Sequence, residues 1–214
     1  YNWYDIQSKE VVGGNYVSSV DSANFTVGLV VLNQYLKELY TNNSKAEISL
    51  KYQALINQCE QMLNKTDFSV FFNEDMGLFR IGFNDRTDKS DDLFYDLLIS
   101  EANLISYLAI AMQQVNPNQW FRHGRRLTRG PLDKPLLTSW SGSLFEYLTS
   151  LLFLPAPEGS LLRHSGENAV TMHKNYVKKY KIPWGMGESA FSLLGADGRY
   201  QYRMFGIAPL AMRW

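Results

Sequence analysis

The chain has 214 residues, of which 45% are hydrophobic and 20% charged, a balance typical of a folded globular protein rather than a disordered one. Basic and acidic residues number 21 each, and this zero net charge argues against a nucleic-acid-binding protein. The single cysteine excludes an internal disulfide and a cysteine-based metal cluster. The three histidines have no metal-ligand spacing, so we expect neither a metal nor another cofactor.

Apolar runs in the chain are interrupted by Asp96, Glu101 and Glu146, and they fall short of the roughly 18 uninterrupted residues of a membrane span. The chain opens without an initiator Met and stops without a closing helix, so we expect both ends to be cuts in a longer polypeptide. The 13 Tyr, 12 Phe and 5 Trp fit a carbohydrate cleft, where rings stack on sugars, and fit a large core equally well.

Residues 1–20 show little periodicity and are expected to be loop. Asp21 and Ser22 offer a helix N-cap ahead of a helix that runs to about Tyr40, with apolar residues on one face. A turn at residues 41–44, with its own N-cap, leads into a second helix that ends at about Leu63. Because the connection is so short, these two helices are expected to pack as an antiparallel hairpin.

Two aromatic and β-branched runs around residues 73–77 predict a β-hairpin within residues 68–84. After it, residues 93–112 are apolar on nearly every side and predict a buried central helix, capped by Asp91 or Asp92. Asp96, Ser100 and Asn103 would form a polar stripe on this helix. Glu101 would point away from that stripe into an apolar arc.

Glu101 in such a position has two interpretations. It is either a structural acid satisfied by an arginine or a backbone amide, or a carboxyl group at the floor of a cleft. In the cleft, burial would raise its pKa into the range that is useful for proton transfer.

The second half of the chain predicts a short helix at residues 118–126 and a loop at residues 129–135. An apolar helix follows at residues 144–154, carrying the single acid Glu146, and a polar-faced helix at residues 161–180. Residues 182–191 read as a tight loop and the tail as extended chain. The alternation of apolar and polar helices indicates an inner and an outer layer, as in a toroid of α-hairpins.

Seven motifs resemble, in order, the glycoamylase-like domain of cyclic β-1,2-glucan synthases. They are N-W-Y-D at 2–5, V-S-S-V-D-S-A-N at 17–24, Y-D-L-L-I-S-E-A at 95–102, W-F-R-H-G-R at 120–125, S-W-S-G-S-L-F-E-Y-L at 139–148, P-W-G-M-G-E-S-A-F at 183–191 and F-G-I-A-P-L at 205–210. The resemblance covers essentially the whole chain. The family usually has serine where this chain has Gly187.

This resemblance implies an all-α fold, an (α/α) toroid of six hairpins, with a small β-hairpin insertion in this chain. Because a closed toroid needs about twelve helices, we expect residues 1–214 to be one incomplete toroid domain that leaves apolar inner-helix surface open to self-association. The family's large bacterial proteins are anchored in the inner membrane, with this domain on the cytoplasmic side. From charge and hydropathy we expect no membrane contact by this segment and no nucleic-acid partner.

The activity that the resemblance implies is cleavage of β-1,2-glucan with transglycosylation, which releases a cyclic glucan. The alternatives are a β-1,2-glucan hydrolase and a non-catalytic glucan-binding or scaffold module. The family's acidic pair falls on Glu188, assigned as the general acid, and Glu101, assigned as the base.

Other residues are candidates for binding the sugar. Trp3, Trp140 and Trp184 are stacking platforms or core residues, and Asp21 is either a sugar ligand or only an N-cap. Glu146 is expected to be a partner of Arg122 or Arg125. The full set of substrate-binding candidates is Trp3, Asp5, Asp21, Asp96, Trp140, Glu146 and Trp184.

Overall fold

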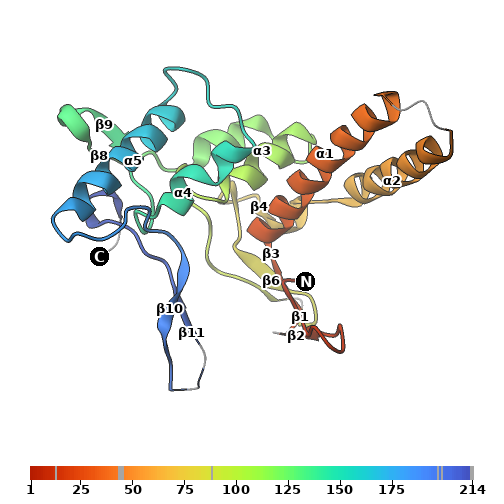
Figure 1. Cartoon of the computed structure of the whole chain (residues 1–214), viewed down its shortest axis with the longest axis horizontal. Helices are drawn as coiled ribbons and strands as arrows, with labels where there is room; N and C mark the ends of the chain where they lie inside the picture. Colours follow the sequence, from red (N-terminus) through yellow and green to blue (C-terminus); the bar gives the residue numbers. More distant parts are fainter. Residues whose placement is uncertain (13, 43–45, 88, 197, 199, 213–214) are drawn as a thin grey trace. The chain divides into compact units, whose positions relative to one another are not determined.

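The computed structural model describes residues 1–12, 14–42, 46–87, 89–196, 198 and 200–212. The chain divides into two compact units, the first formed by Tyr1–Phe94 and Leu104–Trp120 and the second by Tyr95–Asn103 and Phe121–Trp214. Helices and small antiparallel sheets occur in both units (Figure 1). The all-α prediction is therefore corrected to a mostly helical, mixed α and β structure. Within the described ranges, no helix combines the length and the apolar character that crossing a bilayer requires.

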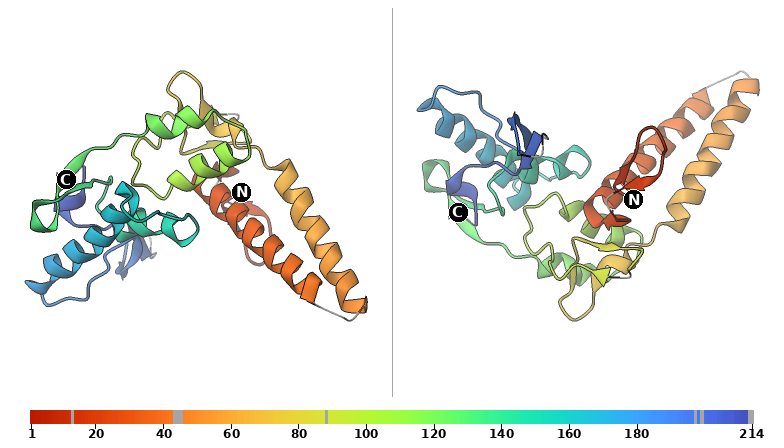
Figure 2. Two further views of the ribbon diagram at one scale, coloured as in Figure 1. Left: turned by 90° about the horizontal axis from the view of Figure 1, so that it is seen from above. Right: turned by 90° about the horizontal axis from the view of Figure 1, so that it is seen from below.

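A helical hairpin is the main feature of the first unit. Helices α1 (Ser19–Asn42) and α2 (Ala46–Lys65) lie side by side and antiparallel, as predicted (Figures 1 and 2). Leu36 packs with Ile56 and Cys59 in the core between them. The predicted turn at residues 41–44 falls partly within α1, and Asn43 and Ser44 lie outside the described residues.

The start of α1 differs from the prediction that Asp21 and Ser22 cap it. The helix begins at Ser19, three residues earlier than a cap at Asp21 would allow, and the hydroxyl of Ser18 accepts a hydrogen bond from the backbone amide of Asp21 at 3.2 Å. A serine ahead of the first turn is a favourable N-cap because its oxygen satisfies an amide that has no intrahelical acceptor. Asp21 therefore lies inside the first turn, and its side chain is exposed.

Short strands complete the first unit. The predicted hairpin is present as β4 and β5, with Phe72 opposite Phe79. The strand order of the three-stranded sheet is β3-β6-β7, and β1 pairs with β2. The bounds in this unit are β1 Trp3–Tyr4, β2 Val11–Val12, β3 Tyr16–Ser18, η1 Ser69–Phe71, β4 Phe72–Asn73, β5 Leu78–Phe79, β6 Gly82–Asn84 and β7 Lys89–Ser90.

The predicted central helix at residues 93–112 is wrong over its first half. Helix α3 spans only Asn103–Ala111, and residues 93–102 are not helical. Within this stretch, the carbonyl of Asp96 accepts from the amide of Gly124 at 2.6 Å, and the amide of Leu98 donates to the carbonyl of Gly124 at 3.1 Å. These lateral bonds satisfy the backbone without a helix. The polar stripe and the caps at Asp91 or Asp92 are wrong for the same reason.

The second unit is built on α4 (Leu144–Leu148), η4 (Ser150–Leu152) and α5 (Leu161–Lys178). The predicted helix at residues 144–154 is thus an α-helical turn continued by a 3₁₀ turn, and α5 matches its prediction closely. Tyr147 is buried and donates to the carbonyl of Leu137 at 2.7 Å. The unit also contains β8 Leu127–Arg129, η3 Pro131–Asp133, β9 Pro135–Leu137, β10 Ser189–Leu194, β11 Tyr200–Arg203 and η5 Ala208–Leu210, and η2 Pro117–Arg122 crosses the boundary between the two units in the sequence.

Candidate functional site

The loop before α4 is organised around the carboxylate of Glu146, which is only 3% exposed. That carboxylate accepts from the backbone amides of Trp140 at 3.0 Å, of Ser141 at 3.1 Å and of Ser143 at 3.1 Å. The hydroxyl of Ser139 donates to it at 2.9 Å, and the hydroxyl of Ser141 donates as well. A buried carboxylate is stable with this many donors. Backbone amides and serine hydroxyls therefore take the role that the sequence assigned to Arg122 or Arg125.

The same loop is held on another side by the segment that follows β11. The amide of Ile207 donates to the carbonyl of Gly142 at 3.2 Å, and the amide of Met212 donates to the carbonyl of Ser139 at 2.8 Å. A Cβ atom at Gly206 would lie 2.2 Å from the carbonyl carbon of Gly142, so only glycine allows this approach. The S-W-S-G-S motif and the F-G-I-A-P-L motif thus form one packed structure.

His173 of α5 is fully buried beneath this loop. Its Nε2 lies 2.9 Å from the carbonyl oxygen of Gly142, so Nε2 carries the proton and donates. Burial lowers the pKa of His173, with the bond to Gly142 acting in the opposite direction. The neutral imidazole is therefore a support for the loop.

Glu188 follows the glycine-rich loop and immediately precedes β10. The loop is anchored because the amide of Leu144 donates to the carbonyl of Met186 at 2.9 Å. Glu188 is partly buried, and the hydroxyl of Tyr202 donates to its Oε2. Burial raises the pKa of Glu188, and the charge of Glu146 adds to this, whereas the Tyr202 hydrogen bond lowers it.

Glu101 lies in the turn just before α3 and is partly buried, with the hydroxyl of Ser100 3.4 Å from its Oε2. Burial raises the pKa of Glu101 from 4.5 to about 7, and the charges of Glu188 and Glu146 act in the same direction. Three glutamates that are far apart in sequence thus influence one another in the second unit. Burial away from water and nearby negative charges both disfavour the ionised carboxylate, and together they keep a proton on a carboxyl group near neutral pH.

Three further candidates, Asp96, Trp140 and Trp184, lie outside the buried core of the second unit. The indole of Trp140 donates to the carboxylate of exposed Asp96 at 2.8 Å, so these two predicted residues are in direct contact. Trp184 is half exposed, and the ammonium group of Lys174 lies 4.6 Å from the centre of its ring. Trp184 is therefore not a core residue.

The candidates in the first unit occupy its N-terminal segment. Trp3 in β1 is exposed and stacks on Tyr16 with 6.4 Å between ring centres. Asp5 closes a local turn by accepting from the amides of Gln7 and Ser8, which lower its pKa. Asp21 accepts a hydrogen bond from the side chain of Asn2. A hollow of about 480 Å³ opens here, lined by Tyr1, Asn2, Tyr4, Val17, Asp21, Ser22 and Phe25.

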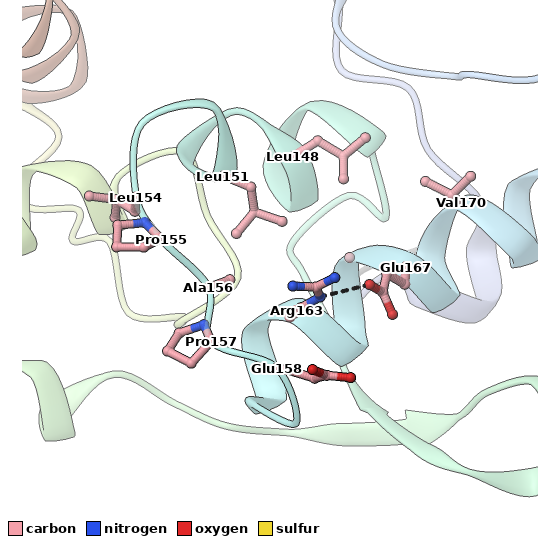
Figure 3. A pocket seen from close by; sticks show the side chains of 11 residues that line it. Leu148, Leu151, Leu154, Pro155, Ala156, Pro157, Glu158, Arg163, Glu167 and Val170 are labelled. Carbon is pink, nitrogen blue, oxygen red and sulfur yellow. Dashed lines mark hydrogen bonds and ion pairs between the residues drawn. The ribbon is translucent and has the colours of Figure 1, made fainter. Parts of the chain in front are cut away.

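A second hollow, of about 580 Å³, lies between the α4–η4 segment and α5 (Figure 3). Leucine and proline side chains form much of its wall, and the ion pair of Arg163 with Glu167 lies at its side. None of the predicted site residues lines this hollow, so it is separate from Glu101, Glu146 and Glu188. Leu148, Leu151 and Gly166 are among its lining residues.

Sequence reasoning missed Tyr202 and the serines that serve Glu146. The register of β10 and β11 pairs Ala190 with Tyr202, which brings Tyr202 close to Glu188, the residue that precedes β10. The sequence marked the tail as aromatic and extended but gave no pairing register. The spacing of Ser143 and Glu146 is that of a capping box, and this signal could have been used.

The chain is similar in sequence to a known bacterial protein. The chain is 34% identical over 148 residues, 69% of its length, to the cyclic beta-(1,2)-glucan synthase NdvB of Rhizobium meliloti (strain 1021). This is a distant homology, and the match spans only about 5% of the length of that relative. No model of a known protein family matches the chain.

Proposed function

We propose that this chain belongs to a carbohydrate-active domain of a cyclic β-1,2-glucan synthase, which cleaves β-1,2-glucan and rejoins it by transglycosylation into a ring. The observation that carries the proposal is the pair of glutamates Glu101 and Glu188. Both carboxyl groups have raised pKa values, and the charge of Glu188 contributes to the raised pKa of Glu101. The homology to a cyclic β-1,2-glucan synthase supports the choice of substrate.

Glycoside cleavage needs one carboxyl group that protonates the leaving oxygen and a second one that acts as base or nucleophile. We assign the first role to Glu188, because its glycine-rich loop allows a sugar to approach closely. Glu101 takes the second role. Burial raises the pKa of Glu188, which favours the protonated form that a general acid needs. It also raises the pKa of Glu101, to about 7, so Glu101 exchanges its proton near neutral pH.

The remaining candidates divide between contact with sugar and support of the site. Trp140 and Trp184 are proposed to stack on glucose rings, and Asp96 to accept from sugar hydroxyls beside Trp140. Glu146 shapes the Trp140 loop through its hydrogen bonds. In the first unit, Trp3, Asp5 and Asp21 are proposed to bind the glucan, with Asp21 at the aromatic-lined hollow.

The wider architecture is also part of the proposal. We propose that the chain is one segment of an (α/α) toroid domain in a large bacterial protein, at the cytoplasmic face of the inner membrane. A β-1,2-glucan hydrolase uses the same pair of acids with water as the acceptor. A non-catalytic glucan-binding or scaffold module would bind the same glucan without turnover.

The test of the acid and base roles uses Glu188→Gln and Glu101→Gln on two substrates, linear β-1,2-glucan and an aryl β-sophoroside whose phenol leaves without protonation. Loss of the acid should abolish cleavage of the glucan and spare much of the cleavage of the aryl substrate. Loss of the base should abolish both. Glu167→Gln is the control, because this exposed acid pairs with Arg163. Turnover unchanged in both variants would contradict the proposal.

A further inference from the structure

Strands β10 and β11 form a hairpin whose first residue follows Glu188 directly. Tyr202 lies on β11 and is paired with Ala190, two positions after Glu188. From there its hydroxyl donates a hydrogen bond to Oε2 of Glu188. The hairpin therefore fixes one oxygen of the proposed general acid and leaves Oε1 without this bond.

We propose that Tyr202 is a positioning residue for Glu188, holding Oε2 as a hydrogen-bond acceptor so that Oε1 is the oxygen that carries and delivers the proton. This inference rests on the proposed function. It goes beyond that function by adding a residue outside the acid pair and by distinguishing the two oxygens of one carboxyl group.

The charged and titratable groups that shift the pKa of Glu188 are Glu146 and Tyr202, and Glu188 in turn raises the pKa of Glu101. Burial and the charge of Glu146 disfavour the carboxylate anion of Glu188, whereas a hydroxyl that donates to the anion favours it. Tyr202 thus opposes the other influences on Glu188. Removing its hydroxyl should make Glu188 a weaker acid and release its side chain from a fixed orientation.

Tyr200 provides a matched control. It lies two residues before Tyr202 on the same strand, so its side chain projects from the same face. Its exposure, 65%, is close to the 63% of Tyr202. Among the described hydrogen bonds, Tyr202 donates to Glu188 and Tyr200 does not.

The experiment compares Tyr202→Phe and Tyr200→Phe in two measurements. Carboxyl titration by NMR on protein with labelled glutamate, assigned with Glu188→Gln, follows Glu188 without any need for activity. The midpoint for Glu188 should move up by about 0.5 to 1 pH unit in Tyr202→Phe and stay unchanged in Tyr200→Phe. In the pH–rate profile of β-1,2-glucan cleavage, the apparent pKa of the group that acts as general acid should move in the same direction. The value of kcat should fall by about tenfold, and KM should change little.

A Glu188 titration that is identical in Tyr202→Phe and the wild type would overturn the inference, whatever the activity. Equal shifts in both tyrosine variants would overturn it as well, because they would report a general change in the hairpin. Absence of β-1,2-glucan cleavage in the wild type, with the titration shift present in Tyr202→Phe alone, would instead reject the proposed function and leave the hydrogen bond established.

Discussion

Glu188 raises the pKa of Glu101 although 87 residues separate them in sequence. Burial is the largest cause, the charge of Glu146 acts in the same direction as that of Glu188, and the pKa of Glu101 is raised to about 7. A carboxyl group with this pKa exchanges its proton under the conditions in which most enzymes work. The relationship between these two residues is therefore the centre of the functional account.

The raised pKa of Glu101 predicts how stability depends on pH. Because the folded protein holds the Glu101 proton more tightly than the unfolded chain, this contribution to stability is complete below pH 4.5 and is lost as the pH rises through about 7. We expect Glu101→Gln, which cannot ionise, to be more stable than the wild type at pH 8, by roughly 2 to 3 kcal/mol. Urea denaturation at pH 5 and pH 8 measures the free energy of unfolding of both proteins. If this free energy changes equally with pH in the wild type and in Glu101→Gln, the prediction is rejected.

Gly206 should tolerate no side chain. A Cβ atom there would lie 2.2 Å from the carbonyl oxygen of Ser141 and 2.4 Å from the amide nitrogen of Ser143, which are backbone atoms that cannot move aside cheaply. We expect Gly206→Ala to lower the free energy of unfolding by about 3 kcal/mol or more.

Gly187→Ser is the matched control for Gly206→Ala. At Gly187 the nearest atom to a new Cβ is the hydroxyl oxygen of Ser143 at 3.7 Å, an ordinary contact. This substitution should leave stability unchanged or raise it by up to about 1 kcal/mol, since serine restricts the unfolded chain. Thermal unfolding of both variants gives the comparison, and a larger loss at Gly187 than at Gly206 would show that the packing is misassigned.

Glu146 should matter for stability more than an exposed acid does. Its carboxylate receives bonds from Ser139, Trp140, Ser141 and Ser143, and an amide in its place would turn an NH₂ group toward some of these donors. We expect Glu146→Gln to cost roughly 2 to 4 kcal/mol. Glu167→Gln, at an exposed ion pair, should cost less than about 1 kcal/mol. Equal costs in calorimetry would argue against the role given to Glu146.

Helix α1 exposes an apolar stripe that contains Phe25, Leu32 and Tyr35, at helical spacing. Gly28 lies in the same stripe, and a Cβ atom there would meet nothing within 4 Å. We expect concentration-dependent self-association of the chain, weakened by Leu32→Glu. Analytical ultracentrifugation is the measurement, with Leu132→Glu as a control at another exposed leucine. A monomer at every concentration tested would contradict this expectation.

Periodicity was sufficient for the long helices of this chain. The predicted pairing of α1 with α2 and the span of α5 agree with the structure because helix propensity and apolar spacing point to one solution there, although the predicted cap of α1 was wrong. The buried side of α1 was predicted less well. Leu36 is buried, but Phe25 and Leu32, which lie on the predicted apolar face, are exposed.

Residues 93–102 show why local reasoning failed at the candidate site. Their apolar sequence suits a helix, yet their backbone bonds with Gly124, a long-range partner that periodicity does not reveal. The residue pattern already marked Glu101 as a candidate, whereas Glu188 and the pairing of the two acids came from resemblance. Their influence on each other, and the hydrogen bond from Tyr202, depend on tertiary structure.

The measurement that tests the central claim most directly is incubation of linear β-1,2-glucan with the protein and with Glu188→Gln, followed by mass analysis of the products. The same comparison is made in the larger synthase proposed above. Cyclic or shortened glucans that form with the wild type and vanish in a folded Glu188→Gln variant are the predicted result, and their masses distinguish cyclisation from hydrolysis. Glucan that binds to the wild type in both contexts and is recovered unchanged would contradict the account and favour a non-catalytic binding module.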